Sequence, residues 1–294
     1  MSVQSPLLGF EAGLQGQSVG PNFCAEVYLH SPNVMAREAK VWHDGGMQVV
    51  ITGIGDAFSA HHHGSSCVVL APRGHVAIDC PGSVMAMYRQ AAETSGLTLG
   101  VEKIDDLVLT HLHGDHSNGL EAFAFARRYL YQPSTRPRLH ALPEVLDRVW
   151  DKLAPAMDGA TRAEGAMSTL EDYFEPCPIE PGVPVEVAGL TMEVRRTAHS
   201  VPTAGVLMRS GSGTLGWSGD TEFEMAHIDW LGQADCIVHE CGEHFKHTHW
   251  AELDSLSEAL KQKIRLIHLP DGTEIPDGPM RPLREGEVLD MKNC

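Results

Sequence analysis

The stretch that decides the fold is Thr110-His111-Leu112-His113-Gly114-Asp115-His116. Three imidazoles and one carboxylate fall within six residues, directly after a predicted strand at 104–110. Imidazole suits zinc, iron and related ions, and a carboxylate adds negative charge. Alternate side chains of an extended segment point the same way, so His111 and His113 can hold one metal together. Asp115 and His116, at the turn into a helix, can face a second metal. The segment therefore predicts a binuclear metal site.

Strands and helices alternate on both sides of this segment. Gly- and Pro-bounded runs rich in β-branched residues predict strands, and apolar periodicity predicts helices. The region 133–186 is expected to contain only short helices and loops. The predicted strands are 47–53, 67–70, 75–79 and 104–110 in the first half, and 190–195, 204–209, 213–218, 236–239 and 265–268 in the second, with helices at 83–92, 118–131 and 253–262. This order favours an α/β protein with two sheets packed face to face and helices outside.

Composition and charge narrow the classes of function. The 294 residues are 43% hydrophobic and carry a formal net charge of −17. A field of that sign repels polyanions, which disfavours a large nucleic-acid substrate. No apolar run reaches the roughly 18 residues that span a bilayer, so no membrane partner is expected.

The two ends of the chain and its cysteines suggest where the protein works. We expect an N-terminal extension at 1–46, followed by one catalytic domain at 47–294. The first residues lack the basic and apolar regions of a signal peptide. The seven cysteines are scattered singly, which is typical of reduced thiols. A cytoplasmic protein is therefore expected, with a homodimer as its assembly.

The His-x-His-x-Asp-His pattern resembles that of the metallo-β-lactamase superfamily. Its other landmarks occur in order at Asp79, His199, Asp220 and His268. The resemblance implies an αββα four-layer metallo-β-lactamase sandwich. It also implies two divalent metal ions, with zinc as the expected metal and iron or manganese as alternatives. The implied ligands are His111, His113 and His199 for the first metal, Asp115, His116 and His268 for the second, and Asp220 as the bridge.

Within the superfamily, the chain most resembles the ribonuclease Z-like phosphodiesterase branch. The segments Gly53-Ile54-Gly55, Ser65-Ser66 and Gly219-Asp220-Thr221 carry this likeness. A bridging aspartate where some β-lactamases have cysteine argues against antibiotic degradation. A histidine at position 113, where flavodiiron proteins have glutamate, argues against redox chemistry.

The same branch implies a carboxylate–histidine pair beside the metals. Glu240 matches the carboxylate, and its partner is either His247 or His249, with His249 favoured because it directly precedes the segment that leads into the predicted helix at 253–262. Such a histidine would protonate the leaving group. Asp115, Glu240 and His249 are thus the expected catalytic residues. The run His61-His62-His63 either caps the site or forms a solvated loop.

These features predict a binuclear hydrolase in which a metal-bridging hydroxide attacks a phosphodiester. Ribonuclease Z has a basic arm between the elements that match His199 and Asp220, but only 20 residues separate them here. A small phosphodiester, such as a cyclic nucleotide, is the expected substrate. The alternatives are an ester, thioester or lactone hydrolase on the same metals, or a diiron redox or oxygen-dependent enzyme.

Overall fold

The protein is described by a computed structural model covering residues 46–159 and 166–291. The predicted N-terminal extension lies outside the described residues, apart from Gly46. No helix in the described part is long and apolar enough to cross a bilayer.

Two seven-stranded mixed sheets form the centre of the fold. The first runs, in spatial order, β14 (Val288–Asp290), β1 (Gln48–Gly53), β2 (Ser66–Ala71), β3 (Gly74–Ile78), β4 (Ile104–Val108), β5 (Arg138–Ala141) and β6 (Glu175–Pro178). The second runs β13 (Arg281–Pro282), β12 (Ile264–Ile267), β11 (Cys236–Glu240), β10 (Gly213–Trp217), β9 (Ala204–Ser210), β8 (Leu190–Arg196) and β7 (Val185–Val187). Each sheet has three antiparallel and three parallel pairings.

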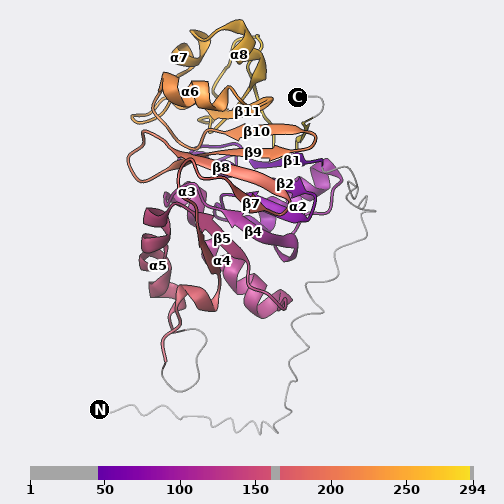
Figure 1. The fold of residues 1–294 in the computed structure, drawn as a ribbon, viewed down its shortest axis with the longest axis vertical. Coiled ribbons are helices and arrows are strands. Elements are labelled where there is room, and N and C mark those ends of the chain that lie inside the picture. Colours follow the sequence, from indigo (N-terminus) through magenta and orange to yellow (C-terminus); the bar gives the residue numbers. More distant parts are fainter. Residues whose placement is uncertain (1–45, 160–165, 292–294) are drawn as a thin grey trace, which may run out of the picture. The chain divides into compact units, whose positions relative to one another are not determined.

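Helices cover the outer faces of the sheets. Figure 1 shows α6, α7 and α8 on the side of the second sheet, and α4 and α5 on the side of the first. The α-helices are α2 (Val84–Ser95), α3 (Gly114–Ser117), α4 (Leu120–Phe125), α5 (Pro143–Met157), α6 (Met225–Leu231), α7 (Trp250–Asp254) and α8 (Glu258–Lys263). Short 3-10 turns lie at η1 (Val101–Lys103) and η4 (Leu170–Asp172), and η2 (Ala126–Tyr131) is a π-helix. The αββα arrangement expected from the sequence is confirmed.

The core lies between the two sheets. β8 shows the alternation of a half-buried strand, with Leu190, Met192 and Val194 buried and the residues between them partly exposed. These three side chains belong to the same buried cluster as Val49 and Val69 of the first sheet. Burial of apolar surface, at about 25 cal/mol per Å², is the main force that holds the layers together.

Several predicted elements differ from the structure. The region 133–186 contains β5, β6 and the long α5 rather than short helices and loops alone. β6 has the sequence Glu-Pro-Cys-Pro, and its two prolines argue against a strand. They are tolerated because β6 lies at the edge of the sheet. The predicted helix at 118–131 is divided between α4 and η2, and a separate short helix, α3, precedes it. The predicted helix at 253–262 is two helices, because α7 ends at Asp254 and α8 begins after the extended residue Ser257.

The cysteines also depart from expectation at one position. Cys67, Cys80, Cys177 and Cys241 are free thiols, as expected. Cys236 is disulfide-bonded, so the prediction that all seven are reduced is wrong for this residue. Spacing along the chain does not reveal which thiols meet in space.

Candidate metal centre

The seven residues expected to bind metal all follow the carboxyl ends of strands. His111 and His113 follow β4, whose end leads into α3 and so brings Asp115 and His116 to the same place. In the second sheet, the three remaining residues follow β8, β10 and β12, and they are His199, Asp220 and His268. Strands of like direction end at the same edge of a sheet, where α/β proteins place their sites. One edge of the sandwich therefore gathers side chains that are up to 157 residues apart.

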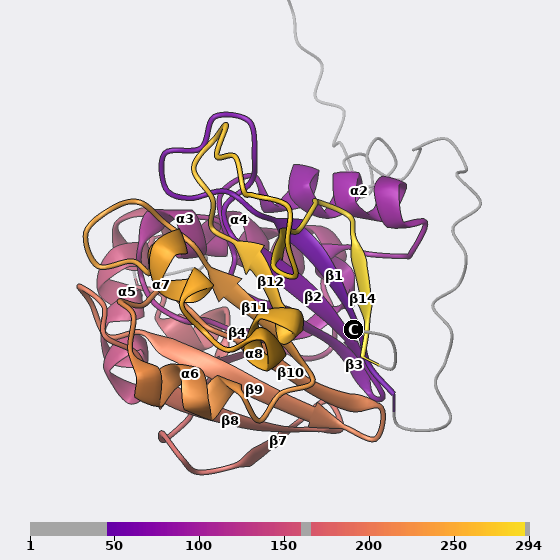
Figure 2. The same ribbon diagram turned by 90° about the horizontal axis from the view of Figure 1, so that it is seen from above.

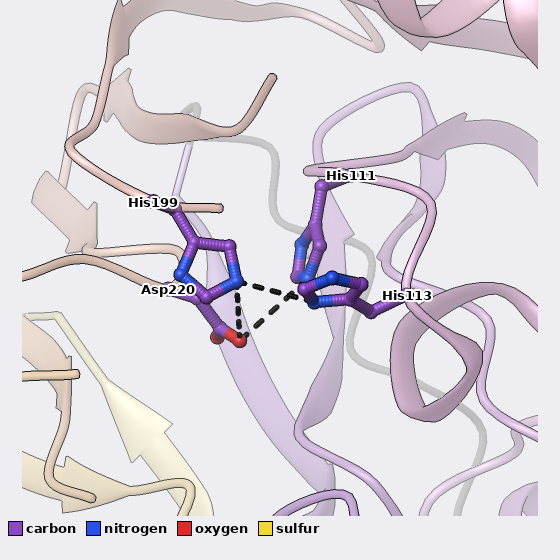
Figure 3. Close-up of side chains that lie close together, drawn as sticks. All are labelled: His111, His113, His199 and Asp220. Atoms are coloured by element: carbon purple, nitrogen blue, oxygen red, sulfur yellow. Dashed lines mark hydrogen bonds and ion pairs between the residues drawn. The ribbon is translucent and has the colours of Figure 1, made fainter. Parts of the chain in front are cut away.

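The carboxylate of Asp220 is the centre of this cluster. Its Oδ2 lies 3.4 Å from His116 Nε2, 3.5 Å from His268 Nε2, 3.6 Å from His111 Nε2 and 3.7 Å from His199 Nε2. Figure 3 shows His111 and His113, from the segment after β4, and His199, from the loop after β8, turned toward this carboxylate. A single oxygen thus faces four imidazoles.

The cluster divides into two groups that share Asp220. One group is His111, His113, His199 and Asp220, and the other is Asp115, His116, Asp220 and His268. Within each group the potential ligand atoms lie within 4.8 Å of one another. Four nitrogen and oxygen donors at such spacing are typical of a transition-metal site.

The buried nitrogens of the cluster fit a metal better than a hydrogen-bond network. The Nε2 atoms of His111 and His116 are buried and have no hydrogen-bond partner among the described residues. Their other ring nitrogens are engaged, His111 Nδ1 with Thr110 Oγ1 at 3.0 Å and His116 Nδ1 with Asp79 Oδ2 at 2.8 Å. Orphaned buried polar atoms are costly unless something binds them. The donor set is therefore suited to cations.

Asp79 organises the histidine loop from behind. Its carboxylate accepts hydrogen bonds from the Thr110 N–H and the Thr110 hydroxyl, at 2.8–2.9 Å, as well as from His116. Metal-binding histidines almost always donate their second ring N–H in this way. Asp79 and His268 both adopt left-handed backbone conformations, with φ of 62° and 59°. Non-glycine residues held there are concentrated at functional sites.

The electrostatics keep the first group of histidines neutral. Burial lowers the pKa of His111 well below its usual value and lowers that of His199 to about 4. Burial alone would raise the pKa of Asp220, but His116, His268 and His111 outweigh it and hold the pKa well below its usual range. In this first group the imidazoles are therefore neutral and the shared carboxylate is ionised, which are the protonation states that bind metal.

A third group joins the edge of the cluster, and it corrects one sequence expectation. His247 Nδ1 donates to Glu240, with 3.1 and 3.0 Å to its two oxygens. The His247 ring stacks on His268, with centroids 4.9 Å apart. His249 instead is exposed and is the N-cap of α7, where its N–H donates to Glu252 at 2.8 Å. The preference for His249 as the partner of Glu240 is wrong.

A sequence signal could have distinguished the two histidines. Glu252 stands three residues after His249, and a glutamate at that position is the mark of a helix N-terminus. That pattern assigns His249 to capping and leaves His247 for the site. No sequence signal indicates that the Lys246 carbonyl accepts the hydrogen bond from His199 Nδ1, at 3.0 Å.

The structure does not bring the run His61-His62-His63 into any of the three groups formed by described residues. His61 and His62 are exposed. His62 faces Glu285 at 3.8 Å, and His63 Nε2 lies 3.4 Å from Gln90 Oε1. Both contacts are with side chains that belong to none of the three groups.

Comparison with known proteins gives a family match over most of the chain. Residues 47–286 match the model of a family described as anti-Pycsar protein Apyc1. An anti-Pycsar protein Apyc1 from Paenibacillus xerothermodurans is 28% identical over 236 residues, which are 78% of this chain and 90% of that protein. A cAMP/cGMP-dependent 3′,5′-cAMP/cGMP phosphodiesterase B from Dictyostelium discoideum is 21% identical over 201 residues, covering 62% of this chain but 17% of that protein.

Solved structures agree on the fold. The metallo-β-lactamase fold protein YhfI from Bacillus subtilis has a TM-score of 0.64 at 17% identity, covering 83% of this chain and 99% of that one. The short form of human tRNase Z has a TM-score of 0.60 at 16% identity, with the same coverage. The metallo-β-lactamase fold expected from the histidine motif is confirmed.

Proposed function

Because the chain belongs to the anti-Pycsar protein Apyc1 family, we propose that it is a metal-dependent phosphodiesterase that hydrolyses a cyclic nucleotide. One observation carries the proposal most directly. Two groups of nitrogen and oxygen donors share a single carboxylate, that of Asp220. Two cations held by these groups would stabilise both the attacking and the leaving oxygen of an in-line displacement.

The proposed ligands follow from the two groups. His111, His113 and His199 would hold one cation, Asp115, His116 and His268 the other, and Asp220 both. Zinc suits this imidazole-rich set, and iron or manganese would also fit. Bound there, the cations would neutralise the phosphoryl charge and supply an activated water as nucleophile.

We assign the proton delivered to the leaving oxygen to His247. The Glu240 carboxylate fixes the ring by accepting its Nδ1 hydrogen, so Nε2 of the doubly protonated ring would be the atom that gives its proton to the leaving oxygen. The ring also lies edge-on to His199, with centroids 5.2 Å apart. A positioned imidazole of this kind is a suitable general acid. The expected proton-transfer role of Asp115 stays a prediction. Although burial raises the pKa of Asp115, His116 and His268 outweigh burial and hold this pKa below the usual value.

The small size expected of the substrate has a counterpart in the fold. The hairpin between β9 and β10 turns directly from Ser210 to Gly213, so no arm is inserted between His199 and Asp220. This supports a substrate the size of a mononucleotide. A homodimer stays a prediction, which light scattering would test.

The experiment is a substrate panel on purified protein of measured metal content. Cyclic adenosine and guanosine 3′,5′-monophosphates should be converted to the nucleoside 5′- or 3′-monophosphates. A thioester, a lactone and a carboxylic ester should be hydrolysed far more slowly. Hydrolysis of one of these three, with no turnover of cyclic nucleotides by the metal-loaded protein, would refute the proposal.

A further inference from the structure

Two phenylalanines stand out among the large hydrophobic side chains. Phe58 is 77% exposed and Phe245 is 83% exposed, whereas Phe123 and Phe174 are fully buried. An isolated exposed hydrophobic residue needs no explanation, but a pair beside a polar site indicates a surface that a ligand covers. Whether a ligand at the metal centre could contact these rings depends on how the loops that carry them are attached to that centre.

Phe58 lies on the loop between β1 and β2, which is fastened to the metal centre at its base. Gly55 bridges both Gly64 and Leu269, the residue after His268. Gly64 lies so close to the Asp115 carbonyl oxygen that any Cβ there would clash with it. The ends of the loop are thus held against two of the proposed ligands.

The tip of this loop is held as firmly as its base. The Asp271 carboxylate accepts hydrogen bonds from the Ser59 hydroxyl and from the N–H groups of Ala60, at 2.7 Å, and His61, at 3.1 Å. Figure 2 shows the two loops concerned, the one after β1 and the one after β12, side by side. Phe58 is therefore presented to solvent by a braced loop.

Phe245 lies on the loop between β11 and α7, which is tied to the same centre. The next residue, Lys246, accepts a hydrogen bond from His199 at its carbonyl, and the one after that is His247. The Lys246 ammonium lies 4.9 Å from the centroid of the Phe245 ring and 2.8 Å from Glu222. The two loops meet where the Phe58 ring contacts the His244 ring edge-to-face, with centroids 5.1 Å apart.

We propose that Phe58 and Phe245, together with His244, form a stacking surface for the base of the nucleotide; we call these three residues the aromatic rim. This inference rests on the proposed function. With the cyclic phosphate at the metal centre, the base projects away from it, toward the loops that surround the site. Aromatic rings stack on any base, because every base has a π-face. The rings of Phe58 and Phe245 carry no hydrogen-bonding group that could read a base edge, so the rim favours bases over no base and purines over pyrimidines.

The test compares substrates with and without a base. Loss of base stacking typically costs about 5- to 150-fold in affinity. We expect Phe58→Ala and Phe245→Ala to lower kcat/KM for the purine cyclic nucleotides within that range, mainly by raising KM. Turnover of methyl riboside 3′,5′-cyclic phosphate, which has no base, should not change. Phe58→Trp should restore the wild-type KM. Val183→Ala, an exposed apolar residue before β7, is the matched control and should behave like the wild type.

A second readout separates this proposal from the proposed function. A 2-aminopurine cyclic nucleotide should lose fluorescence when it binds the wild type, because stacking quenches it, and should be quenched less when it binds Phe58→Ala. Quenching without hydrolysis would support the rim while refuting the phosphodiesterase activity. Equal losses of turnover with and without a base would overturn the rim proposal. The rim proposal would also be overturned if both alanine variants kept the wild-type KM but lost a dimer in light scattering. That result would assign the rim to contact with a second copy of the chain.

Discussion

Asp79 Oδ2 accepts a hydrogen bond from His116 Nδ1 across 2.8 Å, and both side chains are almost completely buried. The contact fixes the ring so that Nε2 faces Asp220. We expect Asp79→Ala to weaken metal binding by roughly 10- to 100-fold, as is usual when such a supporting carboxylate is removed. Competition with a chromogenic chelator measures this. Asp105→Asn, a change at a half-exposed carboxylate paired with Arg127, is the control. Equal affinities in the two variants would contradict the supporting role.

The shared position of Asp220 predicts different losses of metal from different variants. The wild type should hold two ions per chain, and elemental analysis of the purified protein measures them. His111→Ala should chiefly deplete one site, whereas Asp220→Ala should deplete both because it belongs to both groups. A wild type that holds less than one ion, and gains none on reconstitution, would show that the ligand assignment is mistaken.

His247 should matter for the leaving group and not for metal content. Removing a positioned proton donor lowers the rate by roughly 10²–10⁴-fold. His247→Ala should show this loss on a cyclic nucleotide, whose alkoxide needs a proton to leave, and little loss on bis-nitrophenyl phosphate, whose nitrophenolate does not. His249→Ala should remain close to the wild type, because its ring lies at an exposed helix end. Equal losses on both substrates would remove His247 from the role of acid.

Transfer RNA should not be a substrate. The net charge of −17 repels a polyanion, and the β9–β10 hairpin carries no arm to hold one. Gel-shift and cleavage assays with a transfer-RNA precursor should show neither tight binding nor cutting at the 3′ junction. Efficient cutting there, at physiological salt, would contradict this prediction and would indicate a surface that binds RNA.

Asp106 should stabilise the first sheet without affecting the metal centre. It is a buried residue of β4 and accepts hydrogen bonds from two residues of β5, from Arg138 Nε and Nη2, both at 2.6 Å, and from His140 Nε2 at 2.7 Å. Although burial raises its pKa, these partners outweigh burial and hold the pKa below the usual value. We expect Asp106→Asn to lower the free energy of unfolding by about 2–3 kcal/mol.

The pH dependence of this contribution follows from the direction of the shift. A carboxylate whose pKa is lower in the folded protein stabilises fully above its unfolded pKa, near 4, and loses that contribution as the pH falls further. Urea unfolding at pH 7 and at lower pH should therefore show the wild type approaching Asp106→Asn under acid conditions. Glu144→Gln, in an exposed pair with Arg196, should cost less than about 1 kcal/mol. A difference between wild type and Asp106→Asn that stays constant with pH would exclude this origin.

Parts of the fold and of the cluster could be predicted from the sequence wherever residue type and spacing alone determine which side chains lie close together. His111, His113, Asp115 and His116 are adjacent in the chain, so their proximity needs no tertiary information. Asp79, His199, Asp220 and His268 could be identified only by resemblance, because their grouping depends on which strand ends share an edge.

The features that could not be predicted depend on which of two similar residues takes a given position, or on contacts between distant parts of the chain. His247 and His249 are equivalent in chemistry, and the choice between them depends on which one the α7 N-terminus uses as a cap. β6 was missed because its two prolines break the usual strand signal, and the edge position that tolerates them is a tertiary property. The braced loop around Phe58 depends on Asp271, more than 200 residues away along the chain.

The two sheets contribute to the centre in nearly equal parts, with four of the proposed ligands after β4 of the first sheet and three after strands of the second. Neither half of the chain alone could build either of the two groups that share Asp220, because both of these groups take side chains from both halves. Metal binding would therefore stabilise the contact between the two halves of the chain. Loading with metal should raise the midpoint of thermal unfolding, and a half-folded chain should be unable to retain its ions.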